Sequence, residues 1–155
     1  MITGDVLCEE DQDIRRLRVI CDLPVDIDAA GRFVITVDQS IRGVTTPRDL
    51  GEEIREVLKA RGELGPVMWH RSQRYTFLTR RSPDAEASIF YRRALRRTGS
   101  ALIPLGGVLA LPSLNVGARD TQIRKWIHPP RNRFRPDTAT VLAAITECEL
   151  GVPRL

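Results

Sequence analysis

The sequence of 155 residues contains few cysteines and no long hydrophobic run. Its three cysteines, Cys8, Cys21 and Cys148, are an odd set without a CxxC pair, which favours reduced thiols in a cytoplasmic protein over a disulfide framework. No apolar run approaches the roughly 18 residues that a transmembrane helix requires, so we expect no membrane partner. The first residues are acidic, whereas a secretory signal is basic and then apolar, and we therefore expect no export.

Common motifs of nucleotide and metal sites are also missing. The sequence has no GxxxxGK[ST], no GxGxxG at the start of a helix and no GxSxG elbow. The two histidines, His70 and His128, and the cysteines do not have the spacing of a zinc site. A Cys–His nucleophilic pair stays open as an alternative. The sequence therefore predicts no cofactor and no metal.

Charge is distributed unevenly along the chain, although the formal net charge is only +4. Residues 1–30 contain eight acids and three arginines, a net charge of −5, while residues 31–155 contain 21 cations and 12 acids, a net charge of +9. Residues 69–135 alone carry 14 cations and three acids, a net charge of +11. We therefore divide the chain into an acidic segment, residues 1–30, and a single domain, residues 31–150.

The cations are almost all arginines, because Lys59 and Lys125 are the only lysines. The planar guanidinium fork pairs well with phosphate and carboxylate groups, so the bias favours binding of such groups. A GC-rich genome, which favours arginine codons, is the alternative explanation.

Three segments have the start signals, stop signals and apolar spacing of helices. In the first, Thr46 is expected to be the N-cap, with Asp49 in a capping box, and Gly62 ends the helix. The segment 13–21 fits either a short helix or a strand. The predicted helices span residues 46–62, residues 82–99 and a segment that follows Asp137.

Runs of β-branched and alternating residues separate these helices and predict strands. The apolar run over residues 101–114 is interpreted as a central strand region or as a dimer surface. The predicted order is β-α-β-β-α-β-β-β-α, which favours an α+β fold with a mostly antiparallel sheet covered by helices. The predicted strands are residues 33–37, 66–70 and 75–79 around a hairpin loop, 101–105 and 108–112 around a glycine turn, and 121–128.

Aromatic residues alternate with arginines in the basic region, a combination that binds single-stranded nucleic acid by stacking and phosphate pairing. Trp69, Phe77 and Phe90, however, occupy positions expected in a core. The four arginines within residues 92–97 are expected to form a solvated face. The interleaved aromatic residues are Trp69, Tyr75, Tyr91, Trp126 and Phe134.

Four motifs occur in a characteristic order: FVITVD (residues 33–38), GPVMWHRSQRYTF (65–77), GGVLALPSLNVG (106–117) and KWIHPP (125–130). Together they resemble the amino-terminal primase–polymerase domain of bifunctional DNA primase/polymerases, in the archaeo-eukaryotic primase superfamily. They look still more like small actinobacterial proteins that are reduced relatives of that domain. The resemblance implies an RRM-like core with a metal-dependent nucleotidyl-transfer site in the complete family members.

The chain departs from the family pattern at the metal site. The first carboxylate of the family motif falls on Asp38, the second falls on Ser40, and the histidine falls on Tyr75. The later aspartate falls within residues 100–102, where no acid is present. Because two-metal catalysis needs several clustered carboxylates, the comparison implies a degenerate relative in which Asp38 is vestigial and no residue is catalytic.

Three functions follow as hypotheses. The first is a non-catalytic protein-interaction or regulatory module, with a protein partner or a second copy as ligand. The second is binding of DNA, RNA or nucleotide phosphate through an arginine-rich face. The third is a residual metal-dependent nucleotidyltransferase that uses Asp38 with another acid such as Asp120. The residues predicted for the second function are Arg71, Arg74, Arg124 and Lys125, with Trp126 as a stacking surface.

Overall fold

The computed structural model describes residues 9–114 and 122–151 and contains two β-sheets with helices around them. The strands are β1 (Val25–Ile27), β2 (Phe33–Thr36), β3 (Arg42–Pro47), β4 (Val67–His70), β5 (Arg74–Thr79), β6 (Ala101–Leu102), β7 (Val108–Ala110) and β8 (Arg124–His128). The helices are α1 (Glu9–Arg15), the π-helical segment η2 (Arg16–Ile20), α2 (Arg48–Ala60), α3 (Pro83–Ala87), α4 (Ile89–Thr98) and α5 (Thr138–Glu149).

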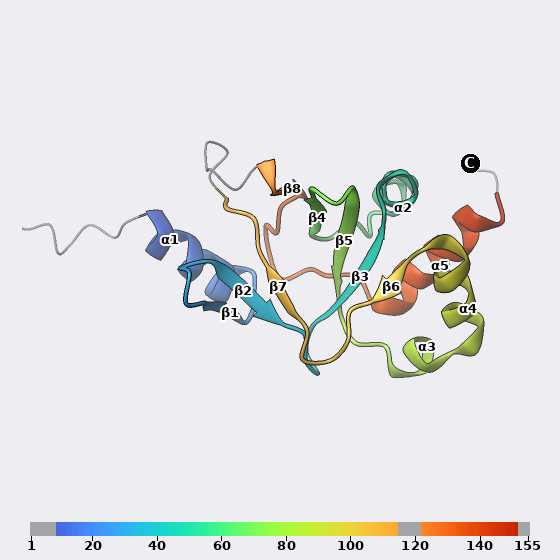
Figure 1. The fold of residues 1–155 in the computed structure, drawn as a ribbon, viewed down its shortest axis with the longest axis horizontal. Helices are drawn as coiled ribbons and strands as arrows, with labels where there is room; N and C mark the ends of the chain where they lie inside the picture. The colour runs from blue at the N-terminus through green and yellow to red at the C-terminus, as the bar shows by residue number, and fades with distance from the viewer. Residues whose placement is uncertain (1–8, 115–121, 152–155) are drawn as a thin grey trace, which may run out of the picture.

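All strand pairs of the two sheets are antiparallel, and the α+β fold class predicted from the sequence is confirmed. One sheet has the order β1-β2-β7 and the other has the order β6-β3-β5-β4-β8. The five-stranded sheet lies between the three-stranded sheet on one side and helices α2 to α5 on the other (Figure 1). The sequence predicts one sheet, and the structure forms two because β2 and β7 pair with each other rather than with β3 or β5.

The predicted order omits two strands, β1 and β3. Strand β3 pairs with β5 over six residues and with β6 at its other edge. Its sequence, RGVTTP, contains a glycine and ends in proline, and both residues are depleted in strands. The predicted Thr46 N-cap and Asp49 capping box are wrong for the same reason. Thr46 is a buried strand residue, and Pro47 is the N-cap of α2, without a side-chain hydrogen bond.

The segment predicted as one helix over residues 82–99 is broken at Ser88. This residue has an extended backbone, and its hydroxyl accepts a hydrogen bond from the backbone N–H of Tyr91, 3.4 Å away. Serine favours such caps because its oxygen satisfies a free N–H at the start of a helix. Gly99 ends α4 in the left-handed conformation, with φ of 70°. Phe90 is 56% exposed, so its predicted core position is wrong, whereas the four arginines are exposed as expected.

The first hydrophobic cluster fills the space between the five-stranded sheet and helices α2, α4 and α5. Phe77, in the central strand β5, is its largest fully buried side chain. Helix α2 approaches the sheet closely at Gly51, where an added Cβ would lie 2.6 Å from a ring carbon of Tyr75. Glycine at this position therefore allows the ring to pack directly against the helix backbone.

The second cluster lies on the opposite face of the five-stranded sheet and includes residues from the acidic N-terminal segment. Leu17, Leu23 and Val25 are at most 2% exposed and pack with Met68 and Leu78 of β4 and β5. The segment 13–21, for which the sequence left helix and strand open, forms helix. Residues 14–25 are therefore part of the packed structure and not an appendage.

The apolar run over residues 101–114 contributes β6 and β7, and each of them is an edge strand, in different sheets. The central-strand interpretation of this run is therefore wrong. Leu105 and Val108, on either side of the glycine turn, are 59% and 62% exposed. No helix within residues 9–114 and 122–151 has the length and apolar character needed to cross a membrane.

Candidate nucleic-acid interface

Polar side chains gather on one face of the five-stranded sheet where β4, β5 and β8 end. Residues directly opposite each other in antiparallel strands project on the same side of a sheet. His70 in β4 is opposite both Arg74 in β5 and Arg124 in β8. The register therefore places one arginine on each side of His70. The same face of the sheet carries Met68 and Trp126 two residues away along β4 and β8. We call His70, Arg71, Arg74 and Arg124 the arginine face.

Hydrogen bonds fix the central part of this face. Nε2 of His70 is 2.9 Å from the hydroxyl oxygen of Thr76, which is only 2% exposed. Arg74 donates from Nε to the hydroxyl of Thr45 at 3.1 Å and from Nη2 to the carbonyl oxygen of Gly99 at 2.9 Å. These contacts hold the Arg74 guanidinium across the ends of β3 and α4.

Burial of the imidazole, together with the charges of Arg124 and Arg74, lowers the pKa of His70 below its usual value. The histidine is therefore neutral at pH 7, and its surroundings are electropositive. An anion bound beside it would offset the two arginine charges and favour protonation of the ring.

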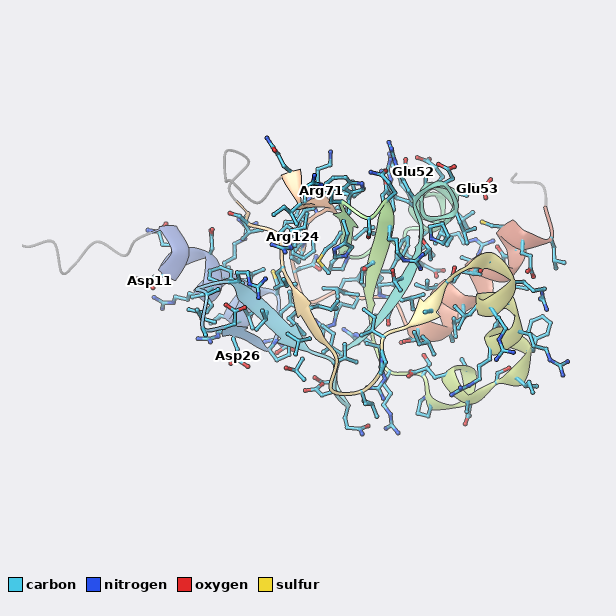
Figure 2. All side chains as sticks on the ribbon, viewed as in Figure 1. Asp11, Asp26, Glu52, Glu53, Arg71 and Arg124 are labelled. Carbon is cyan, nitrogen blue, oxygen red and sulfur yellow. The ribbon has the colours of Figure 1, made fainter. Side chains whose placement is uncertain are left out.

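Arg71 is exposed at the start of the turn between β4 and β5, and its backbone N–H donates to the carbonyl of Ile123 at 2.7 Å. Figure 2 shows Arg71 and Arg124 at the same end of the five-stranded sheet. Among the residues that the structure describes, neither Arg71 nor Arg74 belongs to an ion pair. Both guanidinium charges can therefore act on a ligand.

The structure separates Lys125 and Trp126 from the arginines with which the sequence grouped them. Lys125 projects to the other face of the sheet, where its Nζ lies 5.1 Å from the ring centroid of Trp69. Trp126 lies on the face of Arg124, but its ring packs against the second cluster and its indole N–H donates to the carbonyl of Pro112 at 3.0 Å. Its partly buried ring offers less stacking surface than a free one.

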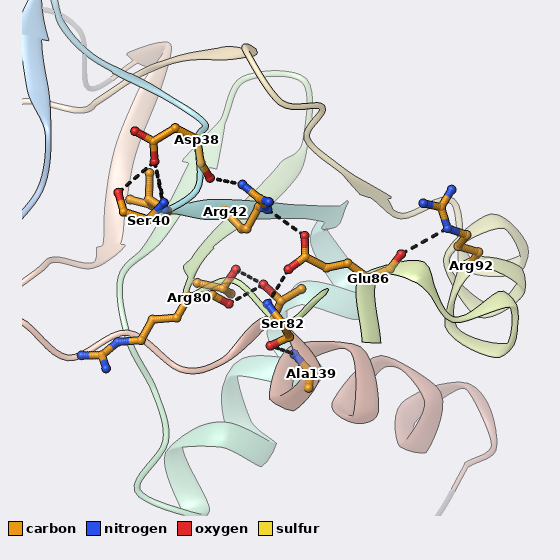
Figure 3. Close-up of polar contacts among 11 residues, drawn as sticks. Asp38, Ser40, Arg42, Arg80, Ser82, Glu86, Arg92 and Ala139 are labelled. Carbon is orange, nitrogen blue, oxygen red and sulfur yellow. Dashed lines mark hydrogen bonds and ion pairs between the residues drawn. The ribbon is translucent and has the colours of Figure 1, made fainter. Parts of the chain in front are cut away.

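Asp38 accepts hydrogen bonds within its own turn. One carboxylate oxygen lies 2.8 Å from both the backbone nitrogen and the hydroxyl of Ser40, and 3.2 Å from the backbone nitrogen of Ile41 (Figure 3). The hydrogen bonds from Ser40 hold the pKa of Asp38 below its usual range. The vestigial carboxylate is thus engaged as a turn former, a common role of aspartate after a strand.

Metal ligands and nucleophiles are the other side chains that could form a site. Within the described part of the chain, no three His, Cys, Asp or Glu side chains form a cluster suited to a metal ion. Cys21 is buried, and burial raises the pKa of its thiol. Cys8 and the proposed partner acid Asp120 lie outside the described residues.

Tyr75, on which the family histidine falls, belongs to a separate polar group. Its hydroxyl donates to Glu52 at 2.5 Å, and Arg55 donates to both oxygens of the same carboxylate at 3.1 and 3.2 Å. Burial and this hydrogen bond raise the pKa of Tyr75 to about 12. The group joins α2 to β5 and lies on the face of the sheet opposite to the arginine face.

Sequence reasoning did not assign His70, Thr45 or Thr76 to a site. Its interpretation of the basic region also placed Arg124 and Lys125 together. The period of two along a strand was the available signal, because adjacent residues of β8 must project to opposite faces. Searches against protein-family models, curated proteins and solved structures found no match to this chain.

Proposed function

We propose that the chain binds single-stranded nucleic acid or nucleotide phosphate through the arginine face. The observation that supports this most directly is the position of His70 between Arg74 and Arg124, on a sheet face where Arg74 has no carboxylate partner among the described residues. Guanidinium groups pair with phosphate oxygens through charge-assisted hydrogen bonds. The primase–polymerase resemblance supports the same class of ligand.

The contribution of phosphate contacts can be measured through salt dependence. Binding of a single strand has a slope of log affinity against log salt of about −0.7 for each phosphate neutralised. Three contacts, from Arg71, Arg74 and Arg124, correspond to about a 20-fold loss of affinity between 50 and 200 mM salt.

We expect a labelled single-stranded DNA or RNA oligonucleotide to bind the full chain at 50 mM salt. In fluorescence anisotropy, the variant Arg71→Gln/Arg74→Gln/Arg124→Gln should lose most of this affinity. The slope of log affinity against log salt should become shallower by the amount expected for about three phosphate contacts. A duplex oligonucleotide measured in parallel reports the preference for single strands.

A matched control removes three exposed arginines elsewhere. The variant Arg93→Gln/Arg96→Gln/Arg131→Gln changes the net charge equally but leaves the arginine face intact. It should retain most of the affinity. An absence of binding at 50 mM salt, or an equal loss in both variants, would refute the proposed function.

A second candidate function is self-association, because edge strands and exposed apolar residues coincide. Strands β6 and β7 each have one unpaired edge within the described sheets. Leu105, between the two strands, and Val108, the first residue of β7, are exposed. Such edges can pair with a second chain. We expect a dimer by size-exclusion chromatography with light scattering, and conversion to a monomer by Leu105→Ser/Val108→Ser; a wild-type monomer at high concentration would eliminate this candidate.

A further inference from the structure

A buried guanidinium lies at the opposite end of the five-stranded sheet from the arginine face. Arg135 precedes α5 and is only 7% exposed. Its Nη1 donates to the carbonyl oxygens of Cys21 and Asp22, at 3.2 and 3.3 Å. Its Nε is buried without a hydrogen-bond partner, and no other buried side-chain nitrogen or oxygen of the described residues is in that state.

The electrostatic surroundings of Arg135 increase the cost of this arrangement. Burial, followed by the charge of Arg80, lowers the pKa of Arg135, and the opposite effect of Asp22 is smaller than that of Arg80. Within the described residues, neither Arg80 nor Arg135 forms an ion pair. The charges of Arg80 and Arg135 therefore act on each other and neither is paired directly with a carboxylate of the described residues, although a buried charge normally has a partner.

A hollow of about 370 Å³ is lined by Arg80, Arg135 and the first turn of α5. Thr140 also lines it, and the positive end of the helix dipole lies there. The backbone N–H groups of residues 138–140 already have acceptors, so the helix contributes its dipole and not free donors. The volume is at the lower end of the range of about 300–1,000 Å³ that is typical of small-molecule sites.

We propose that this hollow binds a phosphate-class oxyanion between Arg80 and Arg135. An oxyanion offers acceptors to both guanidinium groups and neutralises the unpaired charge. Because the hollow is larger than a phosphate ion, a phosphate monoester with a small organic group is the preferred class of ligand. Glu63 and Asp137 also line the hollow and balance the formal charges of the two arginines. This balance favours a single small anion over a polyanion.

The site is independent of the proposed nucleic-acid interface. Arg80 directly follows the carboxyl end of β5, whereas Arg74 is at its beginning, so the two sites lie at opposite ends of one strand. Substitution of the arginine face should therefore leave phosphate binding at Arg80 and Arg135 unchanged. The two proposals can fail separately.

The test measures thermal and chemical unfolding of the full chain with increasing inorganic phosphate or glycerol 2-phosphate. Sodium chloride keeps the ionic strength constant, so that a general salt effect is removed. A ligand that binds only the folded state raises its stability with a saturable dependence on concentration. We expect saturable stabilisation of the wild type, with tighter binding of the monoester.

Arg80 is exposed, so Arg80→Gln should fold and should bind phosphate at least about 10-fold more weakly, the change expected for loss of one charge-assisted hydrogen bond. Arg133→Gln, an exposed neighbour that does not line the hollow, is the matched control and should bind like the wild type. Equal stabilisation of Arg80→Gln and wild type, or no stabilisation beyond that of chloride, would overturn the proposal.

Discussion

Replacing Glu86 with alanine is expected to lower the free energy of unfolding by about 3–5 kcal/mol, the usual cost of leaving one member of a buried ion pair uncompensated. Nε of Arg42 lies 2.7 Å from this carboxylate, and the two side chains are only 8% and 15% exposed. The second carboxylate oxygen accepts from the backbone N–H of Ser82 at 2.5 Å. Removal of Glu86 would therefore leave both the Arg42 guanidinium and the backbone N–H of Ser82 without their carboxylate acceptor.

The surroundings of Arg42 replace Glu86 only in part. The charge of Asp38 acts on Arg42, but the carboxylate of Asp38 accepts its hydrogen bonds from residues of its own turn. Arg42 also donates from Nη1 to the carbonyl oxygen of Asp38, so it joins the turn after β2 to β3 and α3 (Figure 3). The backbone carbonyl of Glu86 accepts from Arg92 at 3.1 Å, which connects the same network to α4. A carbonyl oxygen offsets only part of a full positive charge.

Urea unfolding monitored by circular dichroism measures this effect. Glu86→Gln removes the charge but keeps an acceptor oxygen for one of the two donors, so it should be intermediate between wild type and Glu86→Ala. Glu147→Ala is the control, since its pair with Arg61 is solvent-exposed, and such pairs contribute little to stability. If Glu86→Ala were no more destabilising than Glu147→Ala, the buried pair would not have the role assigned to it.

Leu17→Ala should cost about 2–5 kcal/mol, the range observed when a large aliphatic side chain is removed from a core. Leu17 belongs to η2 in the acidic segment, and its side chain is completely buried in the second cluster. The cost combines lost burial of apolar surface with the cavity that remains. The result would establish that the N-terminal segment contributes to global stability.

Val19→Ala is the matched control for this substitution. Val19 lies in the same segment, but its side chain is 62% exposed, so its truncation should change stability by no more than about 0.5 kcal/mol. A cost of Leu17→Ala equal to that of Val19→Ala would mean that the segment packs only weakly. Because β1 and five core residues lie within residues 1–30, deletion of the whole segment would remove structure as well as negative charge.

Local sequence signals predicted several elements well. The strand at residues 33–37, the hairpin of β4 and β5, and α5 were identified from apolar spacing and turn residues. These signals operate over a few residues, as strand period, capping and glycine conformation do. The mistakes occurred where tertiary contacts outweigh them, as in β3, which ends in proline and contains a glycine yet pairs along its whole length with β5.

The candidate site was predicted only in part. Arg71, Arg74 and Arg124 were selected because they lie in a basic region, and the structure brings them to one end of the sheet. Lys125 was placed with them, although the alternation of side chains along β8 already separates it from Arg124. The burial of Trp126 depends on the second cluster, which contains residues from distant parts of the chain such as Leu17 and Ile35, and no local pattern predicts it.

The sequence by itself determined the helices with clear spacing, the β4–β5 hairpin, the excess of arginine and the isolation of Asp38 from other acids. Tertiary structure alone decided that β8 pairs with β4, because strand order is set by packing over long distances in the chain and not by local period. That pairing places Arg124 beside His70. The burial of Arg135 against Cys21, which is 114 residues away, likewise arises from the fold, since only a closed core can remove a guanidinium from water.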